Sequence, residues 1–275
     1  MKVAIIGVGL IGGSIAMALK EKNIATSIIG VDANESHQQM ALDLKLVDSI
    51  TDMDNAIEAS DLVILAVPVD VAISLLPQIL NKVSKQVVMD VGSTKNNVCK
   101  LSNSKRFVAT HPMWGTEFSG PAAAVSGAFV DKAVVICNRE NTDADALALV
   151  EGMYKNLGMH IIYMEAAAHD LHAAYISHIS HITSFALANT VLEKEKEDDA
   201  IFELASGGFE STVRLAKSNA DMWVPIFMQN KENVLDVLNE HISQLKKFKS
   251  CLEKDNYDYL AELIQKANTI TRILK

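Results

Sequence analysis

The chain has 275 residues, of which 49% are hydrophobic, and a formal net charge of −9 at pH 7. An acidic surface offers no counter-charge to nucleic acid or to an anionic membrane, so we expect neither as a partner. Three scattered cysteines, Cys99, Cys137 and Cys251, favour free thiols and a cytoplasmic protein. No apolar run is long enough to span a bilayer, and we expect no signal peptide, because the first predicted strand starts at residue 2.

A glycine motif follows the first predicted strand. The β-forming run 3–6 leads into Gly7-Val8-Gly9-Leu10-Ile11-Gly12, and residues 14–20 then have helical composition. In such a strand–motif–helix unit, Gly7 permits the tight turn, Gly9 lets the backbone approach a pyrophosphate, and Gly12 lets helix and strand pack closely. The helix start adds unpaired N–H groups and the positive end of its dipole. The N-terminus therefore predicts a dinucleotide site.

Asp32 ends the second β-forming run, 27–31, twenty residues after Gly12. A carboxylate at this position accepts hydrogen bonds from the adenosine ribose and repels the 2′-phosphate of NADP. Residues 33–35 supply no Arg or Lys to bind that phosphate, so the predicted cofactor is NAD. Three apolar residues are expected to line the same site: Leu10, Ile11 and Val67.

Seven short β-rich runs alternate with helical stretches up to about residue 165: VAIIG, SIIGVD, DLVILAVPV, QVVMDVG, RFVATHP, KAVVIC and HIIYM. Continuous apolar runs are typical of strands buried on both faces, which indicates a parallel sheet covered by helices. After about residue 166 the periodicity is helical, with a charged break at 193–199. The expected helical stretches are 166–192, 199–218, 221–250 and 256–274.

We therefore predict an α/β protein with two domains. A Rossmann-type doubly wound sheet, residues 1–165, binds NAD, and an all-helical C-terminal domain, residues 166–275, binds substrate and forms the dimer interface. The active site is expected in the cleft between the two domains.

Two polar loops follow predicted strands, at the sheet edge where ligands of doubly wound folds bind. Ser93, in the run Asp90-Val91-Gly92-Ser93-Thr94-Lys95, suits contact with cofactor or substrate, or else caps a helix over 96–102. His111 comes directly after the strand FVAT. Its near-neutral pKa suits it to take or share the proton of a substrate hydroxyl, and a purely structural histidine is the alternative.

The helical half carries a polar cluster, Ser177, His178 and His181, within an apolar helix. Spacings of three and four residues place these side chains on one face. Two imidazoles one turn apart are compatible with zinc, but no third Cys, Asp or Glu ligand is obvious nearby, so we predict no metal site. Two buried, hydrogen-bonded histidines are the other alternative.

Arg214 follows a Gly-Gly turn and is one of only four arginines in a chain that otherwise uses lysine. Its planar fork favours two-pronged recognition of a substrate carboxylate, and a surface arginine is the alternative. Trp223, nine residues later, is expected to form an apolar wall.

Six motifs occur in order along the chain: GVGLIGGS, AVP, D-x-GS-x-K, HPMxGTE, SHxxH, and R-x-A-K-S followed by M-W. Together they resemble the prephenate and arogenate dehydrogenases of tyrosine biosynthesis, over essentially the whole chain. The resemblance implies that His111 binds the substrate 4-hydroxyl and that Ser93 supports His111. It also implies that His181 lines the substrate pocket and that Arg214 binds a substrate carboxylate. Further substrate-binding residues are expected within or beside these motifs: Ser177, Trp223 and Glu117.

The implied reaction is the NAD-dependent oxidative decarboxylation of prephenate to 4-hydroxyphenylpyruvate. As His111 accepts or polarises the hydroxyl proton, hydride leaves C4 for the nicotinamide and carbon dioxide departs from C1. Aromatisation supplies the thermodynamic drive, so the protein mainly positions the reactants and handles one proton. The resemblance also implies a homodimer formed through the helical half. The family usually has a small residue after HPM, where this chain has Trp114.

Three other interpretations stay open. Arogenate differs from prephenate only in an amino group in place of the side-chain keto group. A β-hydroxyacid dehydrogenase would be expected to use a lysine on the first long helix of the second domain, where this chain has Ser177, His178 and His181. A non-catalytic NAD sensor would keep the glycines and Asp32 but would not need His111.

Overall fold

The computed structural model describes residues 1–196, 201 and 203–273. The chain divides into two compact units, 1–230 and 231–275, and each is described by itself. Part of the charged break expected at 193–199 lies outside the described residues, because only residues up to 196 are described there.

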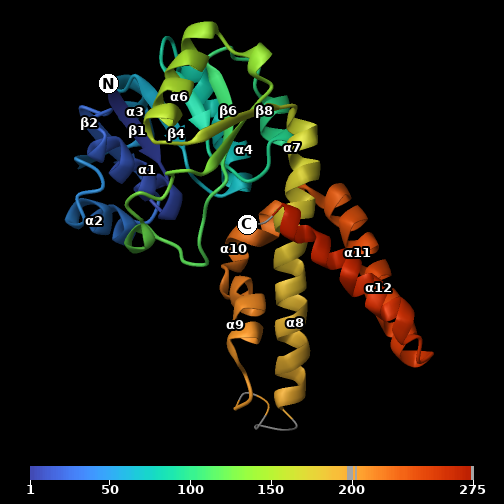
Figure 1. Cartoon of the computed structure of the whole chain (residues 1–275). Coiled ribbons are helices and arrows are strands. Elements are labelled where there is room, and N and C mark those ends of the chain that lie inside the picture. The colour runs from blue at the N-terminus through green and yellow to red at the C-terminus, as the bar shows by residue number, and fades with distance from the viewer. Residues whose placement is uncertain (197–200, 202, 274–275) are drawn as a thin grey trace. The chain divides into compact units, whose positions relative to one another are not determined.

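One eight-stranded sheet forms the centre of the first unit, in the order β3-β2-β1-β4-β5-β6-β7-β8 (Figure 1). The strands are β1 (Lys2–Ile6), β2 (Ser27–Val31), β3 (Ser49–Ile50), β4 (Leu62–Leu65), β5 (Val87–Asp90), β6 (Phe107–Pro112), β7 (Ala133–Cys137) and β8 (His160–Met164). The order reverses beside β1, which makes the sheet doubly wound, and this confirms the predicted fold class. Ligands of such sheets bind at the carboxyl ends of the strands next to the reversal.

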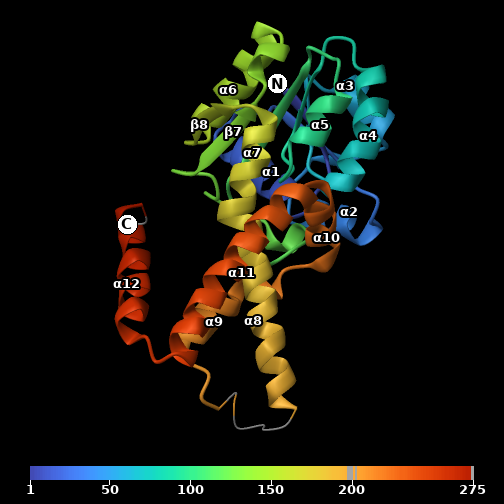
Figure 2. The ribbon, with the colours of Figure 1, turned by 90° about the vertical axis from the view of Figure 1, so that its right-hand side faces the viewer.

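Helices cover both faces of the sheet. They are α1 (Leu10–Glu21), α2 (Glu35–Asp43), α3 (Met53–Ala59), α4 (Val69–Lys82), α5 (Asn96–Leu101) and α6 (Ala144–Asn156). Side chains of β1 alternate between two buried clusters: Val3 and Ile5 pack with α1 and α6, while Ala4 and Ile6 pack with α3, α4 and α5. Figure 2 shows α6 and α4 on opposite sides of the sheet. Burial on both faces explains why these strands are continuous apolar runs.

The glycine motif is required by close backbone contacts. Gly7 has φ +96°, and a Cβ there would lie 2.3 Å from the carbonyl oxygen of Ala66 at the end of β4. A Cβ at Gly12 would lie 2.0 Å from the carbonyl oxygen of Gly7. Any side chain at either position would force β1, β4 and α1 apart, so these two glycines fix the turn that leads into α1.

The sheet differs from the expectation of a parallel sheet in one pair. Strands β6 and β7 are antiparallel, with His111 opposite Val135. The connection between them, 113–132, contains only a 3-10 turn, η1 (Pro121–Ala123), whereas a parallel neighbour normally needs a helical crossover. Two smaller differences concern short or exposed strands: β3 has two residues and was not predicted, and β8 is an edge strand with mostly accessible side chains.

After β8 the described residues form helices and turns. In the first unit these are α7 (Ala166–Ala173), a π-helical turn η3 (Ala174–His178), α8 (Ile179–Glu195), α9 (Gly207–Val213), a 3-10 turn η5 (Arg214–Lys217) and α10 (Ala220–Gln229). Here α9 and η5 pack against α8, and α10 packs against α4 (Figure 1). The second unit contains α11 (Lys231–Glu253), α12 (Tyr257–Asn268) and a short turn η6 (Thr269–Arg272).

Two expected helices are interrupted. The stretch 166–192 contains the π-helical turn between α7 and α8, and the stretch 221–250 breaks at Asn230. The backbone of Asn230 is no longer helical, with φ −108° and ψ 26°. Its side-chain amide donates a hydrogen bond to the carbonyl oxygen of Asp170, 2.7 Å away. This contact with α7 is tertiary, so helical periodicity alone did not predict the break.

Candidate active site

Two neighbouring cavities open at the carboxyl ends of the central strands. The first, which we call the glycine-loop cavity, has a volume of about 240 Å³ and is lined by the motif and the ends of β4 and β5, including Gly9, Leu10, Ile11, Val67 and Ser93. The second, the histidine cavity, has a volume of about 290 Å³ and is lined among others by Ser93, His111, Ser177, His181, Arg214 and Trp223. Leu10, Ile11, Ser93 and Met222 line both cavities. A ligand in one cavity therefore adjoins a ligand in the other.

The glycine-loop cavity has the features that a dinucleotide requires. A Cβ built on Gly9 meets no atom within 4 Å, so the space above this glycine is open for a pyrophosphate. No side chain caps the start of α1, which leaves its first N–H groups to a ligand. Asp32 lies beside the motif, since its Oδ2 accepts a hydrogen bond of 3.0 Å from the Val8 N–H and its Oδ1 one of 2.9 Å from the Asn34 N–H. The residues present therefore fit NAD.

His111 is the next-to-last residue of β6 and reaches the second cavity from the sheet. Its Nδ1 lies 2.8 Å from Nε2 of His169, and Nδ1 of His169 lies 2.8 Å from Oδ1 of Asp170. Both partners come from α7 and are only 2% exposed. The sequence interpretation missed His169 and Asp170, although two adjacent titratable residues in the alanine-rich run 166–174 were a visible signal.

The pKa of His111 lies well below the ordinary imidazole value. Burial is the main cause, and the nearby His169, Lys95 and His178 act in the same direction. His111 is therefore uncharged at neutral pH and has a lone pair available for a proton.

A buried ion pair lies directly behind this strand. Lys95 is fully buried, pairs with the Asp90 carboxylate, and also donates a hydrogen bond of 2.8 Å to the carbonyl oxygen of Thr110. Asp90 in turn accepts hydrogen bonds from the backbone N–H groups of Gly92 and Thr110. These contacts fasten β5, β6 and the start of α5 together beneath the two cavities.

His181 forms part of an aromatic wall in the histidine cavity. Its ring stacks on the buried Trp223, with centroids 3.5 Å apart and planes at 28°. Its Nδ1 donates to the carbonyl oxygen of Ser177 at 3.0 Å, so its Nε2 is the free ring nitrogen. Burial lowers the pKa of His181. His178 is different: it is 1% exposed and its Nδ1 accepts from the Asn230 amide at 3.2 Å, as in the alternative of a buried, hydrogen-bonded histidine.

Arg214 begins η5, and its side chain is 50% exposed. One guanidinium nitrogen, Nη1, donates to Oε2 of Glu117 at 2.9 Å. Glu117 belongs to the loop between β6 and β7 and lines the glycine-loop cavity, whereas Arg214 lines the histidine cavity. The pKa of Glu117 is lowered by the backbone N–H of Glu117 itself and by the guanidinium of Arg214. Direct contact of Glu117 with a substrate stays a prediction.

Ser93 lines both cavities, and His111 lines the second of them. The described hydrogen bond of His111, however, goes to His169, so the expected support from Ser93 stays a prediction.

Residues 15–163 match the family model described as prephenate dehydrogenase, nucleotide-binding domain, and residues 165–266 match prephenate dehydrogenase, dimerization domain. The chain belongs to the prephenate dehydrogenase family.

Characterised relatives support this membership. The chain is 32% identical to the cyclohexadienyl dehydrogenase of Zymomonas mobilis over 99% of this chain and 96% of that protein. It is 30% identical to the prephenate dehydrogenase of Bacillus subtilis over 92% of this chain and 71% of that protein.

Solved structures of this family have the same fold. Prephenate dehydrogenase from Aquifex aeolicus, in complex with hydroxyphenyl propionate and NAD+, aligns with a TM-score of 0.89 and 30% identity over 100% of this chain and 98% of that one. Arogenate dehydrogenase from Synechocystis aligns with a TM-score of 0.78 and 27% identity over the full length of both chains.

Trp114, the unusual residue in this prephenate dehydrogenase family member, is accommodated by the core. Its ring packs edge-to-face on Phe129, with centroids 5.5 Å apart, while part of the residue lines the histidine cavity. Trp114 therefore contributes both to core packing and to the wall of that cavity, and His111 keeps its place in β6.

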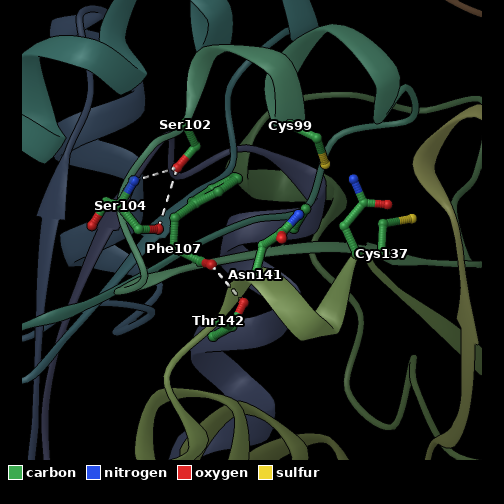
Figure 3. A pocket seen from close by; sticks show the side chains of 9 residues that line it. Cys99, Ser102, Ser104, Phe107, Cys137, Asn141 and Thr142 are labelled. Atoms are coloured by element: carbon green, nitrogen blue, oxygen red, sulfur yellow. Dashed lines mark hydrogen bonds between the residues drawn. The ribbon is translucent and has the colours of Figure 1, made fainter.

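A third, much smaller recess contains none of the predicted site residues (Figure 3). Its volume is about 30 Å³, and its lining includes Cys99, Phe107, Cys137 and Thr142. Thr142 closes one side by donating to the Phe107 carbonyl oxygen at 3.0 Å. Burial raises the pKa of Cys99 to about 12 and that of Cys137 further, so both remain unreactive thiols.

Among the described residues, no group of three or more His, Cys, Asp or Glu side chains is placed to hold a metal ion. In the same part of the chain, no helix combines the length and apolar character needed to cross a membrane.

Proposed function

We propose that this protein is an NAD-dependent prephenate dehydrogenase, which converts prephenate to 4-hydroxyphenylpyruvate by oxidative decarboxylation in tyrosine biosynthesis. The observation that carries the proposal is the position of an uncharged, partly buried His111 in a cavity that adjoins the dinucleotide site and contains a half-exposed arginine. A hydroxy acid whose hydroxyl faces His111 and whose carboxylate faces Arg214 fits this arrangement.

Each part of the chain has a separate task in the reaction. The residues of the glycine-loop cavity would hold NAD, which when bound would supply the hydride acceptor. The motif and the start of α1 bind its pyrophosphate, and Asp32 binds its ribose. Nε2 of His111 takes the proton of the substrate hydroxyl, and Arg214 pairs with a substrate carboxylate. Aromatisation of the product supplies the driving force, so the protein contributes orientation and the handling of one proton.

The remaining roles follow from the lining of the two cavities. We assign His111 and Ser93 to catalysis, because both lie where the cavities meet. Substrate-binding roles are assigned to His181, Arg214, Ser177, Trp223 and Glu117. Cofactor-binding roles are assigned to Gly7, Gly9, Leu10, Ile11, Gly12, Asp32 and Val67.

The enzyme acts as a homodimer, since residues 165–266 match the dimerization domain of the family. We place the domain boundary between residues 165 and 166, where the sequence changes from β-rich to helical; the two family models meet nearby, one ending at residue 163 and the other starting at residue 165. The three free cysteines support a cytoplasmic location.

Arogenate is the second candidate substrate. A relative of known structure is an arogenate dehydrogenase, and the carboxylate of Glu117 beside Arg214 provides an acceptor for the amino group that arogenate carries in place of a keto group.

The test is absorbance at 340 nm with the purified protein, NAD and three kinds of substrate: prephenate, arogenate and simple β-hydroxy acids. We expect NADH to form with prephenate, accompanied by release of carbon dioxide. Faster turnover of arogenate would reassign the substrate, and NADH formation only with β-hydroxy acids would overturn the proposal.

A further inference from the structure

A continuous chain of hydrogen bonds connects the buried interior to His111. It runs from the Asp170 carboxylate to His169 and from His169 to His111, with two nitrogen–acceptor distances of 2.8 Å. The rings of the two histidines meet edge-on, with centroids 5.0 Å apart and planes at 70°. All of these contacts lie within the first compact unit.

The Asp170 carboxylate sets the direction of every bond in this chain. Its Oδ1 accepts from the backbone N–H of Lys95 at 2.7 Å, and its Oδ2 accepts from the backbone N–H of Asn96 at 2.9 Å. Both oxygens are thus held as acceptors by donors that cannot be reversed. The facing Nδ1 of His169 must therefore carry the proton and donate it to Asp170.

The tautomer of His111 follows from that of His169. When Nδ1 alone of His169 carries a proton, its Nε2 presents a lone pair. The nitrogen opposite, Nδ1 of His111, must then be the donor. The remaining ring nitrogen of His111, Nε2, is left without a proton.

We propose that His169 and Asp170 are positioning residues that fix His111 in the tautomer whose Nε2 accepts the substrate hydroxyl proton. The proposal rests on the proposed function for the identity of that substrate. In the step itself the hydroxyl O–H bond breaks, its electron pair stays on the substrate oxygen, and the proton bonds to Nε2. The positive charge that then forms on His111 is connected through His169 to the negative charge of Asp170.

The surroundings of His111 make such a connection necessary. Burial disfavours a positive charge on this ring most strongly, and His169, Lys95 and His178 act in the same direction. A carboxylate two hydrogen bonds away is the compensating negative charge on the interior side, while the cavity side carries the cationic Arg214. His169 also avoids direct contact between that carboxylate and His111, which keeps the base uncharged before the reaction.

A structural role is the competing explanation, because Asp170 also fastens α7 to the start of α5. Substitution of Asp170 would break both functions at once. No described hydrogen bond joins His169 to the α5 backbone, so its variants separate positioning from fastening. His172 offers a matched control, since it is a histidine on the same helix whose side chain is exposed.

The first measurement is long-range ¹H–¹⁵N NMR of the full-length protein labelled with ¹⁵N-histidine, without substrate, with His111 assigned by comparison with His111→Asn. We expect a protonated Nδ1 and an unprotonated Nε2 for His111, and the same result for His172→Gln. A protonated Nε2 on His111 in the wild-type protein would overturn the proposal. This measurement needs no variant of His169 to fold and no knowledge of the substrate.

The second measurement is steady-state kinetics with prephenate. His169→Leu should lower kcat about 100-fold, near the lower end of the value of a positioned acid–base group, while KM changes less than about threefold. His169→Gln, whose amide oxygen can accept from Nδ1 of His111, should recover at least about tenfold of that loss. His172→Gln should match the wild type.

The outcomes distinguish the two proposals. A wild-type protein that turns over neither prephenate nor arogenate contradicts the proposed function, while the NMR result still decides the tautomer. An active wild type whose kcat survives His169→Leu within about threefold contradicts the positioning role alone.

Discussion

Glu117 holds Arg214 at the border of the two cavities by one hydrogen bond of 2.9 Å. In the described part of the chain this is the only hydrogen bond of the guanidinium, whose side chain is half exposed. The rest of its planar fork thus remains available to a ligand in the histidine cavity. A loop that lines the glycine-loop cavity thereby orients a side chain of the histidine cavity.

Replacing Arg214 tests the substrate pocket. Arg214→Ala should raise the KM for prephenate by about 10- to 1000-fold, because a two-pronged pair with a carboxylate is lost, and should leave the Kd for NAD nearly unchanged. Arg214→Lys should recover only part of the loss, since an ammonium keeps the charge but not the fork. Steady-state kinetics and NAD titration give both values. Arg139→Ala serves as the control, and wild-type KM in both Arg214 variants would make Arg214 a surface residue.

His111 is expected to carry the proton transfer. His111→Asn should lower kcat by roughly 10²- to 10⁴-fold, the usual contribution of a positioned acid–base group, with little change in NAD affinity. Full kcat in this variant, measured by NADH formation, would remove His111 from the mechanism.

The pH dependence of kcat/KM reports the pKa of His111 in the free enzyme. The base must be uncharged, and the structure lowers the pKa of His111 well below 6.5. Activity should therefore stay constant as pH falls to 6.5 and decline only below it. The sequence alone predicted a near-neutral pKa for His111. The structure revises this prediction downward, because the sequence did not show that the ring loses contact with water. A decline already between pH 8 and 7 would argue against this state of His111.

Cofactor preference depends on Asp32. The wild type should prefer NAD over NADP by at least about tenfold in kcat/KM, equivalent to about 1.4 kcal/mol. The carboxylate is fixed beside the motif by the N–H groups of Val8 and Asn34, so it meets a 2′-phosphate directly. Asp32→Ala should narrow the ratio. Equal use of both cofactors by the wild type would contradict the assignment.

Protein stability should fall in mild acid because of His178. Burial lowers the pKa of His178 to about 4 from 6.5, so between these values the unfolded chain binds a proton that the folded chain does not. The free energy of unfolding has its full value above pH 6.5. As the pH falls toward 4, it decreases by about 2–3 kcal/mol through this group. Denaturant titrations at pH 7 and pH 4.5 measure the decrease. His178→Gln should reduce this decrease in the free energy of unfolding between pH 7 and pH 4.5. An unchanged decrease would exclude His178 as its source.

The oligomeric state provides a further test. Helices α11 and α12 and the turn η6 expose several large apolar side chains: Leu245, Leu252, Ile264 and Ile270. Together with the match to a dimerization domain, these residues favour association with a second copy. Light scattering at micromolar concentration should give about twice the chain mass of 29.9 kDa. A fully active monomer would contradict this prediction.

The sequence was most informative where function depends on local pattern. The glycines, Asp32 and His111 act within short segments, so their positions in the fold followed from periodicity and strand ends. The contact between His111 and His169 joins residues 58 positions apart, and only the packing of α7 against the sheet creates it. The direction of β7 and the break at Asn230 were likewise missed, because both depend on tertiary contacts.

The buried pair of Lys95 and Asp90 restricts how this enzyme can change by mutation. Loss of either partner alone leaves a charge without compensation in the interior, at a cost of about 3–5 kcal/mol, a large share of the stability of a typical domain. A library of single substitutions should therefore reject nearly every change at both positions. A double substitution that replaces both residues by apolar side chains of matching volume should be tolerated. These positions consequently evolve as one unit, and redesign of the neighbouring cavities should treat them as such.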